Sequence, residues 1–256
     1  MKLFKSMISA FLMYSKIPMP RIAWTAENRR YALCFFPLIG VLIGILLLLW
    51  RSVCAMLSLS PLLCGVGSVL VPILVTGGIH LDGFCDVNDA RASYADREKQ
   101  CAILSDPHIG AFAVIKLCMY LMLQAALMAE LTKHAASIVA LGFILSRSLS
   151  GLTAVTFRAA KKTGTLQAFV SPAHKKVTIL SLISTAALVS IGMLCIRPAL
   201  AVAALLGAGL SVGCYKRMAY RNFGGITGDT AGWFLQVCEM TLLISTVLTE
   251  KIMMGG

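Results

Sequence analysis

Charged residues are scarce in this sequence, and acidic residues are the scarcest of them. Asp, Glu, Lys and Arg make up 13% of the 256 residues, while hydrophobic residues make up 58%. A soluble domain is about a quarter charged and about half apolar. Together with a mean hydropathy of +0.84, this composition excludes an ordinary soluble protein and predicts an integral membrane protein.

Linkers, repeats and paired cysteines are also lacking. No stretch rich in Gly, Ser and Pro divides the apolar segments, so residues 1–256 are expected to form a single membrane-embedded domain. No Cys-x-x-Cys pair occurs among the nine cysteines, and most of them lie inside apolar segments. Their odd number and their positions argue against disulfides or a zinc site and predict free thiols.

The N-terminal segment MKLFKSMISAFLMYSKIPMPR lacks the long apolar core of a signal peptide. Its mostly apolar stretch covers only residues 6–14, and Lys2, Lys5 and Lys16 punctuate the segment. This pattern predicts an amphipathic helix on the membrane surface, with an uncleaved signal sequence as the alternative.

Long apolar runs supply most of the remaining chain. A helix needs about 20 mostly apolar residues to cross a bilayer. We therefore expect an all-α, polytopic bundle of about seven transmembrane helices, at residues 34–50, 57–78, 109–131, 135–156, 177–196, 199–215 and 231–250. The fifth and sixth are expected to form a tight hairpin. Small residues four positions apart, Gly40 with Gly44 and Gly209 with Gly213, predict close helix packing.

Basic residues predict the orientation of the bundle. With the N-terminus in the cytoplasm, 17 of the 23 Lys and Arg residues fall in cytoplasmic segments and 4 fall outside. The positive-inside rule then directs the loops 79–108 and 216–230 to the cytoplasm. Anionic lipid head groups account for much of the net charge of +12, a polyanionic substrate could use the rest, and no nucleic acid is required.

Six of the 11 acidic residues lie in one stretch, residues 77–112. Asp82, Asp86 and Asp89 follow at steps of four and three, which puts them on one face of a helix. No Gly or Pro interrupts residues 84–104, so we expect the helix to continue over this range. Because three such carboxylates repel each other and Mg²⁺ or Mn²⁺ prefers oxygen ligands, the cluster predicts a divalent metal site.

Other polar residues of this stretch allow more than one interpretation. Asp96 and Glu98 fit a solvated helix whose acids pair with neighbouring basic residues, which is also the alternative for the whole cluster. His80 lies two residues before Asp82 and would cap a helix, orient a ligand or contact the substrate. Asp106 precedes a proline and either caps the next helix or adds a metal ligand.

A second polar cluster, RNFGGITGDTAGWFLQVCEM, opens the last apolar segment. Its flexible turn, whose backbone N–H groups can approach an anion closely, contains Gly224, Gly225 and Gly228. Asp229 follows, and Glu239 lies ten residues further on, where an intramembrane acid is functional by default. The alternative is that Glu239 pairs with Arg147, which lies deep in another span and could equally hold a phosphate oxygen.

A basic stretch, RAAKKTGTLQAF at residues 158–169, lies between the two clusters. It would contact lipid or cradle a diphosphate. Clustered aspartates, glycine turns and basic residues at a membrane surface indicate phosphoryl or pyrophosphate chemistry, in which metal and basic side chains neutralise the departing phosphate.

Four motifs in this order along the chain are SKIPMP (15–20), HLDGFCDVNDA (80–90), LSDPHIGAFAV (104–114) and GGITGD (224–229). They resemble the cobalamin synthase family, the adenosylcobinamide-GDP ribazoletransferases. The chain departs from the family pattern at His108, where the family usually has arginine, and in KKTGTLQAF, a loose version of a Gly-Leu-Gly stretch.

The resemblance implies a Mg²⁺-dependent transferase of the bacterial inner membrane. Adenosylcobinamide-GDP and α-ribazole, or α-ribazole 5′-phosphate, would give adenosylcobalamin, or its 5′-phosphate, and GMP, the last assembly step of vitamin B12. A homo-oligomer or a complex with other cobalamin-assembly enzymes stays open.

The resemblance also implies roles for individual residues. The implied metal ligands are Asp82, Asp86, Asp89 and Asp229. One aspartate, either Asp106 or Asp89, would accept the proton of the attacking hydroxyl. The implied substrate-binding residues are His80, Arg147, Arg158, Gly224, Gly225, Thr227, Gly228 and Glu239.

Two other functions compete with this interpretation. A CDP-alcohol phosphotransferase also combines membrane helices with spaced aspartates, but its Asp-Gly-x-x-Ala-Arg and Gly-x-x-x-Asp-x-x-x-Asp patterns are missing. A cation transporter would carry acids near the midplane of several spans. Here most acids lie at the predicted cytoplasmic edge, and only Glu239 is deep.

Overall fold

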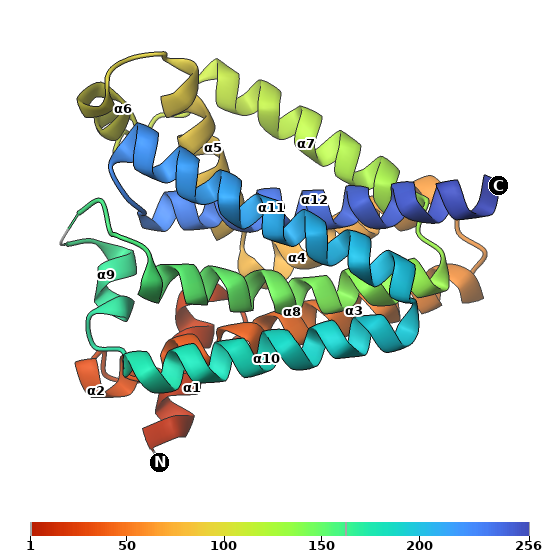
Figure 1. Cartoon of the computed structure of the whole chain (residues 1–256), viewed down its shortest axis with the longest axis horizontal. Helices are drawn as coiled ribbons and strands as arrows, with labels where there is room; N and C mark the ends of the chain where they lie inside the picture. Colours follow the sequence, from red (N-terminus) through yellow and green to blue (C-terminus); the bar gives the residue numbers. More distant parts are fainter. Residues whose placement is uncertain (1, 162, 256) are drawn as a thin grey trace.

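The computed structural model describes residues 2–161 and 163–255, which are folded almost entirely into helices (Figure 1). Lys162, one of the basic residues counted for the orientation, lies outside these residues. The helices are α1 (Lys2–Tyr14), α2 (Ala26–Arg29), η1 (Ala32–Phe35), α3 (Phe36–Met56), α4 (Pro61–Thr76), α5 (Ile79–Ala92), α6 (Arg97–Ile103), α7 (Ala111–Ala129), α8 (Lys133–Thr156), α9 (Thr165–Val170), α10 (Lys175–Ile196), α11 (Pro198–Phe223) and α12 (Gly228–Gly255).

Long apolar helices confirm the all-α polytopic membrane bundle. Six segments are long and apolar enough to cross a membrane, and a bent pair, α4 with α5, would make a seventh. The tight hairpin is confirmed, because α10 ends at Ile196 and α11 begins at Pro198. The first helix also forms as expected, with its basic N-terminal residues exposed and its other face packed on the protein.

The chain breaks sharply where the acidic stretch begins. Gly77 and Gly78 both adopt positive φ, at 66° and 78°, which ends α4 and turns α5 by 97°. Positive φ is readily adopted by glycine and costly for most other residues. The expected span at 57–78 therefore becomes the shorter helix α4, and α5 leads the aspartates away from its axis.

The continuous helix expected over residues 84–104 is wrong. Helix α5 ends at Ala92, Tyr94 adopts a φ of 51°, and α6 starts only at Arg97. The carboxylate of Asp96 accepts a hydrogen bond from the backbone N–H of Lys99 at 2.9 Å. Capping by an aspartate competes with helix continuation, so this single polar residue starts a new helix that the apolar pattern does not reveal.

Glycine positions decide which long helices approach closely. A Cβ on Gly40 would lie 2.4 Å from the carbonyl oxygen of Phe143, and one on Gly44 would lie 2.8 Å from that of Ala140. The packing predicted for this pair is confirmed, since it seats α3 on α8. The packing predicted for Gly209 and Gly213 is wrong, because a Cβ on either would meet nothing within 4 Å.

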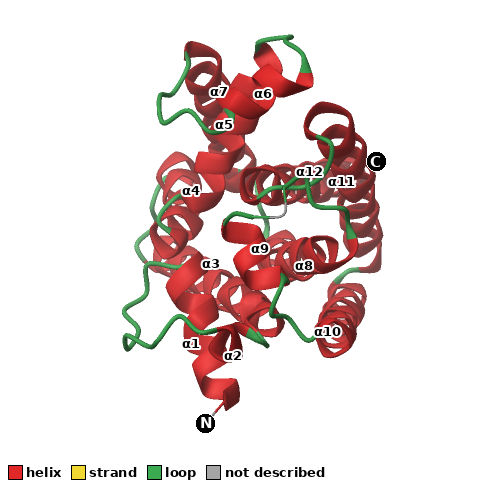
Figure 2. Cartoon of the chain, turned by 90° about the vertical axis from the view of Figure 1, so that its left-hand side faces the viewer, coloured by secondary structure: helices red, strands yellow, loops and turns green. Residues whose placement is uncertain are grey.

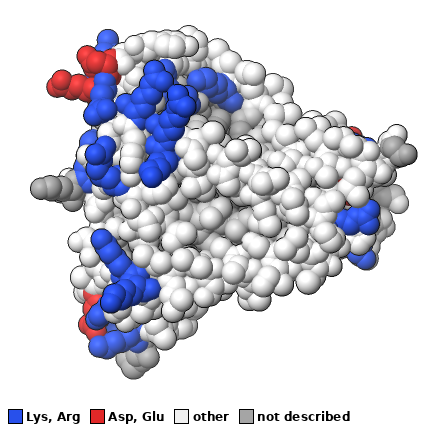
Figure 3. Space-filling view, in the orientation of Figure 1, with Lys and Arg blue, Asp and Glu red and all other residues white. Residues whose placement is uncertain are grey.

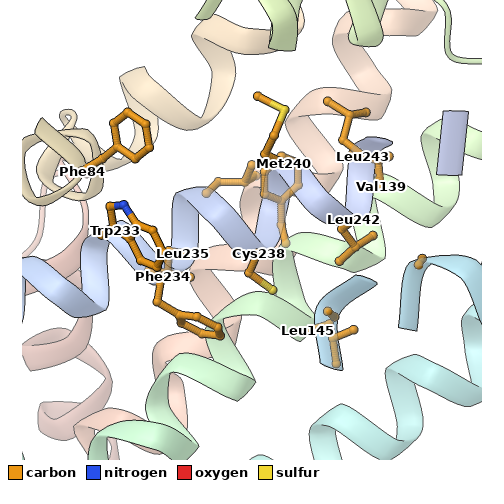
Figure 4. Packing of buried hydrophobic residues seen from close by; sticks show 14 of the residues in the cluster. Phe84, Val139, Leu145, Trp233, Phe234, Leu235, Cys238, Met240, Leu242 and Leu243 are labelled. Atoms are coloured by element: carbon orange, nitrogen blue, oxygen red, sulfur yellow. The ribbon is translucent and has the colours of Figure 1, made fainter. Parts of the chain in front are cut away.

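Helix α12 runs through the middle of the bundle and carries much of its core. Trp233, Phe234 and Leu235 at its start, and Leu242 and Leu243 further along, are buried against α5, α8 and α11 (Figure 4). This packing fixes the N-terminal end of α12 beside α5, at the left of Figure 1.

Lys and Arg side chains gather at the same end of the molecule, with a smaller group at the opposite end (Figure 3). In the view onto this end, α9 lies near the centre, α1 and α2 lie below it, and α5 and α6 lie above it (Figure 2). The basic end therefore brings together the N-terminal helix, the acidic stretch and the glycine turn.

Candidate active site

A cavity of about 370 Å³ opens among these segments. Ligand sites typically enclose roughly 300–1,000 Å³, so it has the volume of a small-molecule site. One side is formed by α5 and the start of α12, and the other by α1, η1, α3 and the end of α8. Lys161 and residues 163–167 also line it.

Two glycines let α5 and α12 cross almost backbone to backbone. A Cβ on Gly83 would lie 2.6 Å from the carbonyl oxygen of Asp229, and one on Gly232 would lie 3.1 Å from that of His80. This close crossing brings Asp82 and Asp229, which are far apart in the sequence, to the same cavity. We call these two carboxylates the acidic wall.

The two other predicted metal ligands follow along α5 and do not line this cavity. Asp86 is half-buried and close enough to Asp82, Asp229 and Asp89 for mutual repulsion. Asp89 lies against the loop before α7, where a Cβ on Gly110 would be only 2.0 Å from its Oδ2 atom. The shared helix face is thus present, but the acids divide between the cavity and the α7 side.

The glycine turn holds the start of α12 at the cavity. Gly224 adopts a φ of 75° and ends α11. The N–H of Ile226 donates to the carbonyl of Arg158 at 2.9 Å, and the N–H of Ala160 donates to the carbonyl of Ile226 at 2.9 Å. The Thr227 hydroxyl accepts from the N–H of Thr230 at 3.2 Å, which caps α12. Thr227 and Gly228 both line the cavity.

Two basic residues of the stretch 158–169 have different positions. Arg158 is exposed, its Nε donates to the carbonyl of Gly224 at 3.0 Å, and its guanidinium lies over the ring of Tyr220. Arg158 therefore fixes the glycine turn. Lys161 lines the cavity, near Ser105, and interacts electrostatically with Asp229. The sequence indicates a basic stretch here but not which of its residues reaches the cavity.

His80 lies buried behind the acidic wall. Its side chain is 5% exposed, lines the cavity, and has its ring centroid 6.4 Å from that of Tyr14 and 6.1 Å from that of Phe36. Its Nε2 atom has no hydrogen-bond partner within the described part of the chain. His80 is thus a core residue that also borders the cavity, and its role toward a substrate stays a prediction.

Arg147 and Glu239 form a buried ion pair. Nη1 of Arg147 lies 2.7 Å from Oε1 of Glu239, and the two side chains are 1% and 6% exposed. The hydroxyl of Ser146 also donates to Glu239 at 3.0 Å. The pair borders a cavity of only about 10 Å³ next to His80, which is room for about one water and not for a phosphate.

Asp106 lies outside the cavity, in the exposed loop between α6 and α7. Its carboxylate accepts a hydrogen bond from the backbone N–H of His108 at 2.9 Å and contacts the His108 ring at 2.7 Å. These bonds hold the pKa of Asp106 below its usual range, the backbone bond first. A carboxyl with a lowered pKa is a weaker base, and this one is committed to local structure.

The acidic wall fits a magnesium ion that is bound together with a phosphorylated ligand. Among the described residues, no group of three or more His, Cys, Asp or Glu side chains is arranged to hold a metal by itself. Magnesium is usually held by one or two carboxylates together with substrate phosphates. Asp82 and Asp229 supply that smaller set, so the donors suit a metal that arrives with a phosphorylated ligand.

Comparisons with known proteins agree along the whole chain. A family model described as cobalamin-5-phosphate synthase matches residues 6–247. An adenosylcobinamide-GDP ribazoletransferase of Lachnoclostridium phytofermentans is 41% identical over 256 residues, covering 100% of this chain and 98% of the relative. A protein of the same name from Geobacillus kaustophilus is 33% identical, covering 96% of this chain and 96% of the relative. Another from Clostridium botulinum is 30% identical, covering 96% of this chain and 98% of the relative. No solved structure matches.

Proposed function

The chain belongs to the cobalamin-5-phosphate synthase family, and on that premise we propose that it is an adenosylcobinamide-GDP ribazoletransferase. A ribose hydroxyl of α-ribazole forms a bond to the phosphorus that carries cobinamide, and the bond from this phosphorus to GMP breaks. The attacking hydroxyl is a secondary one, because the 5′ position is already occupied when the acceptor is α-ribazole 5′-phosphate. The products are adenosylcobalamin, or its 5′-phosphate, and GMP.

The acidic wall is the observation that supports this chemistry at this cavity. Asp82 and Asp229 meet there, with Lys161 and the N-terminus of the 28-residue helix α12 beside them. A helix N-terminus and a lysine attract phosphate, while the two carboxylates repel it unless a cation lies between. The site therefore suits a diphosphate bound together with a divalent ion.

Asp82 and Asp229 would hold Mg²⁺ with the diphosphate oxygens. When bound, the ion neutralises charge on the reacting phosphate and on the departing GMP. The proton of the attacking hydroxyl passes to a carboxylate within hydrogen-bond reach. This requirement favours the acidic wall over Asp89 and Asp106, since those two residues lie away from the cavity.

The basic end of the molecule would face the bacterial cytoplasm. The positive-inside rule assigns the side with more Lys and Arg to the cytoplasm, and these side chains gather around the cavity end (Figure 3). Nucleotide substrates in the cytoplasm would then reach the site directly from the inner face of the cell membrane.

We expect purified protein to release GMP from adenosylcobinamide-GDP only when both α-ribazole and Mg²⁺ are present. Removing the metal with EDTA should stop turnover, because the acidic wall would repel the diphosphate, and adding Mg²⁺ back should restore it. Chromatography would identify adenosylcobalamin as the corrinoid product. Tight substrate binding without GMP release under any metal condition would contradict the proposal, and cation flux in liposomes would then favour the transporter.

The crossing of α5 and α12 should be sensitive to a single methyl group. In Gly83→Ala the new Cβ would lie 2.6 Å from the Asp229 carbonyl oxygen, so the helices must separate. A displacement of about 1 Å can cost on the order of 100-fold in rate, and we expect a loss of that order in kcat. Gly209→Ala is the matched control, because a Cβ there meets nothing within 4 Å. Equal kcat values for the two variants would contradict the role of the crossing.

A further inference from the structure

The side of the cavity opposite the acidic wall is apolar. We call it the apolar wall, and it consists of Met13, Tyr14, Leu33, Phe36, Ala154 and Leu166. These residues come from α1, η1, α3, α8 and α9. All of these helices except α3 contribute to a second hydrophobic cluster, and Phe36 of α3 joins it through its contact with Tyr14. The cavity therefore has one surface suited to charged groups and another suited to an apolar group.

Aromatic side chains stiffen the apolar wall. The Tyr14 ring lies with its centroid 4.3 Å from that of Phe36 and 5.6 Å from that of Phe169. Phe169 is fully buried and supports Tyr14 from behind the cavity surface. Such a packed group of rings is fixed before a ligand arrives, and aromatic rings favour flat aromatic ligands through stacking and edge contacts.

We propose that the apolar wall binds the base of α-ribazole, a flat benzimidazole that carries two methyl groups. This inference rests on the proposed function and extends it, because it assigns one part of one substrate to named residues. With its base on the apolar wall, α-ribazole directs its ribose across the cavity toward Asp82 and Asp229. The attacking hydroxyl then lies on the side where the diphosphate binds.

The other aromatic base in the reaction is guanine, and the wall fits it poorly. Guanine has hydrogen-bond donors and acceptors along its edge, and burying such groups without partners is costly. The polar side chains beside this wall are few, chiefly the hydroxyls of Tyr14 and Ser150, the ring of His80 and the amide of Gln167. Dimethylbenzimidazole has one ring-nitrogen acceptor and no donor, so it loses far less than guanine on burial, and the apolar chemistry of the wall selects the acceptor base.

The volume of the cavity supports the same assignment. At about 370 Å³ it lies near the lower end of the range for small-molecule sites. It suits a nucleoside-sized ligand such as α-ribazole and is too small to enclose a corrinoid as well. The corrin ring of the donor therefore stays outside this cavity, and its diphosphate reaches the acidic wall.

Replacing Ala154 by leucine tests the proposal. Ala154 is 6% exposed and lies in the apolar wall, so Ala154→Leu fills space that the base would occupy. We expect the KM for α-ribazole to rise at least about tenfold, the range for one misfitted methyl-sized group. The KM for adenosylcobinamide-GDP should stay within about twofold. For α-ribazole analogues without the two methyl groups, Ala154→Leu should raise the KM by a smaller factor. The control is Ala187→Leu, which adds the same volume to an exposed position on α10.

A second variant and a binding measurement keep the test independent of folding and of turnover. Tyr14→Leu removes the stacking ring and should weaken α-ribazole binding about tenfold in calorimetry without the donor substrate, in line with base–aromatic stacking elsewhere. An unchanged KM for α-ribazole in both variants would overturn the proposal. A rise only in the KM for adenosylcobinamide-GDP, or only in the inhibition constant of GMP, would also overturn it, because either result would assign the wall to guanine. A wild-type protein without turnover would instead overturn the proposed function.

Discussion

Asp82→Asn should lower kcat by at least about 1,000-fold while leaving the protein folded. Loss of one preorganised electrostatic contact typically costs 100- to 1,000-fold, and Asp82 would supply both a metal ligand and half of the acidic wall. Its side chain is exposed to the cavity and accepts no hydrogen bond from the described residues. Neutralising it also removes repulsion with Asp86, so we expect thermal stability to be unchanged or slightly raised.

The measurement combines GMP release with a melting curve in detergent. Glu98→Gln is a suitable control, because Glu98 is an exposed acid of α6, in the same acidic stretch but away from the cavity lining. It should retain turnover close to that of the wild type. If Asp82→Asn kept more than about a tenth of wild-type kcat, the acidic wall would not be the reaction centre, whatever the family membership.

Local patterns in the sequence were sufficient for most of the fold. Apolar runs predicted the long helices, and the four-and-three spacing predicted the shared helix face of Asp82, Asp86 and Asp89. The motifs also predicted the family, which the comparisons confirm. These features depend on residues that are near each other in the chain, so periodicity and composition are enough to reveal them.

The arrangement of the site depended on contacts that local patterns do not encode. The Gly77–Gly78 pair is visible in the sequence, but the 97° turn it makes is a property of both backbone conformations together. The crossing at Gly83 and Gly232 joins residues about 150 positions apart. The apolar wall was missed for the same reason, because Tyr14 and Phe36 look like ordinary core residues until α1 is placed beside α3.

The ion pair of Arg147 and Glu239 had two interpretations in the sequence, and the structure favours pairing over phosphate binding. Arg147→Met would leave Glu239 charged and buried without its partner, which typically costs about 3–5 kcal/mol. We therefore expect a large fall in melting temperature in detergent. Glu239→Leu should do the same by leaving the guanidinium unpaired, since Nη1 otherwise reaches mainly the carbonyl of Phe143, at 3.0 Å.

The double variant Arg147→Met/Glu239→Leu separates the two interpretations. Replacing a whole buried ion pair with apolar residues of similar volume is often neutral or stabilising, and Ser146 keeps the carbonyl of Phe143 as an acceptor at 3.1 Å. We expect the double variant to recover most of the stability lost in either single variant and to turn over within about tenfold of the wild type. If Arg147 instead held a phosphate oxygen, the double variant would melt normally but lose turnover by roughly the 100- to 1,000-fold that one electrostatic contact supplies. Because the pair borders a space of only about 10 Å³ behind His80, stability should be restored together with turnover.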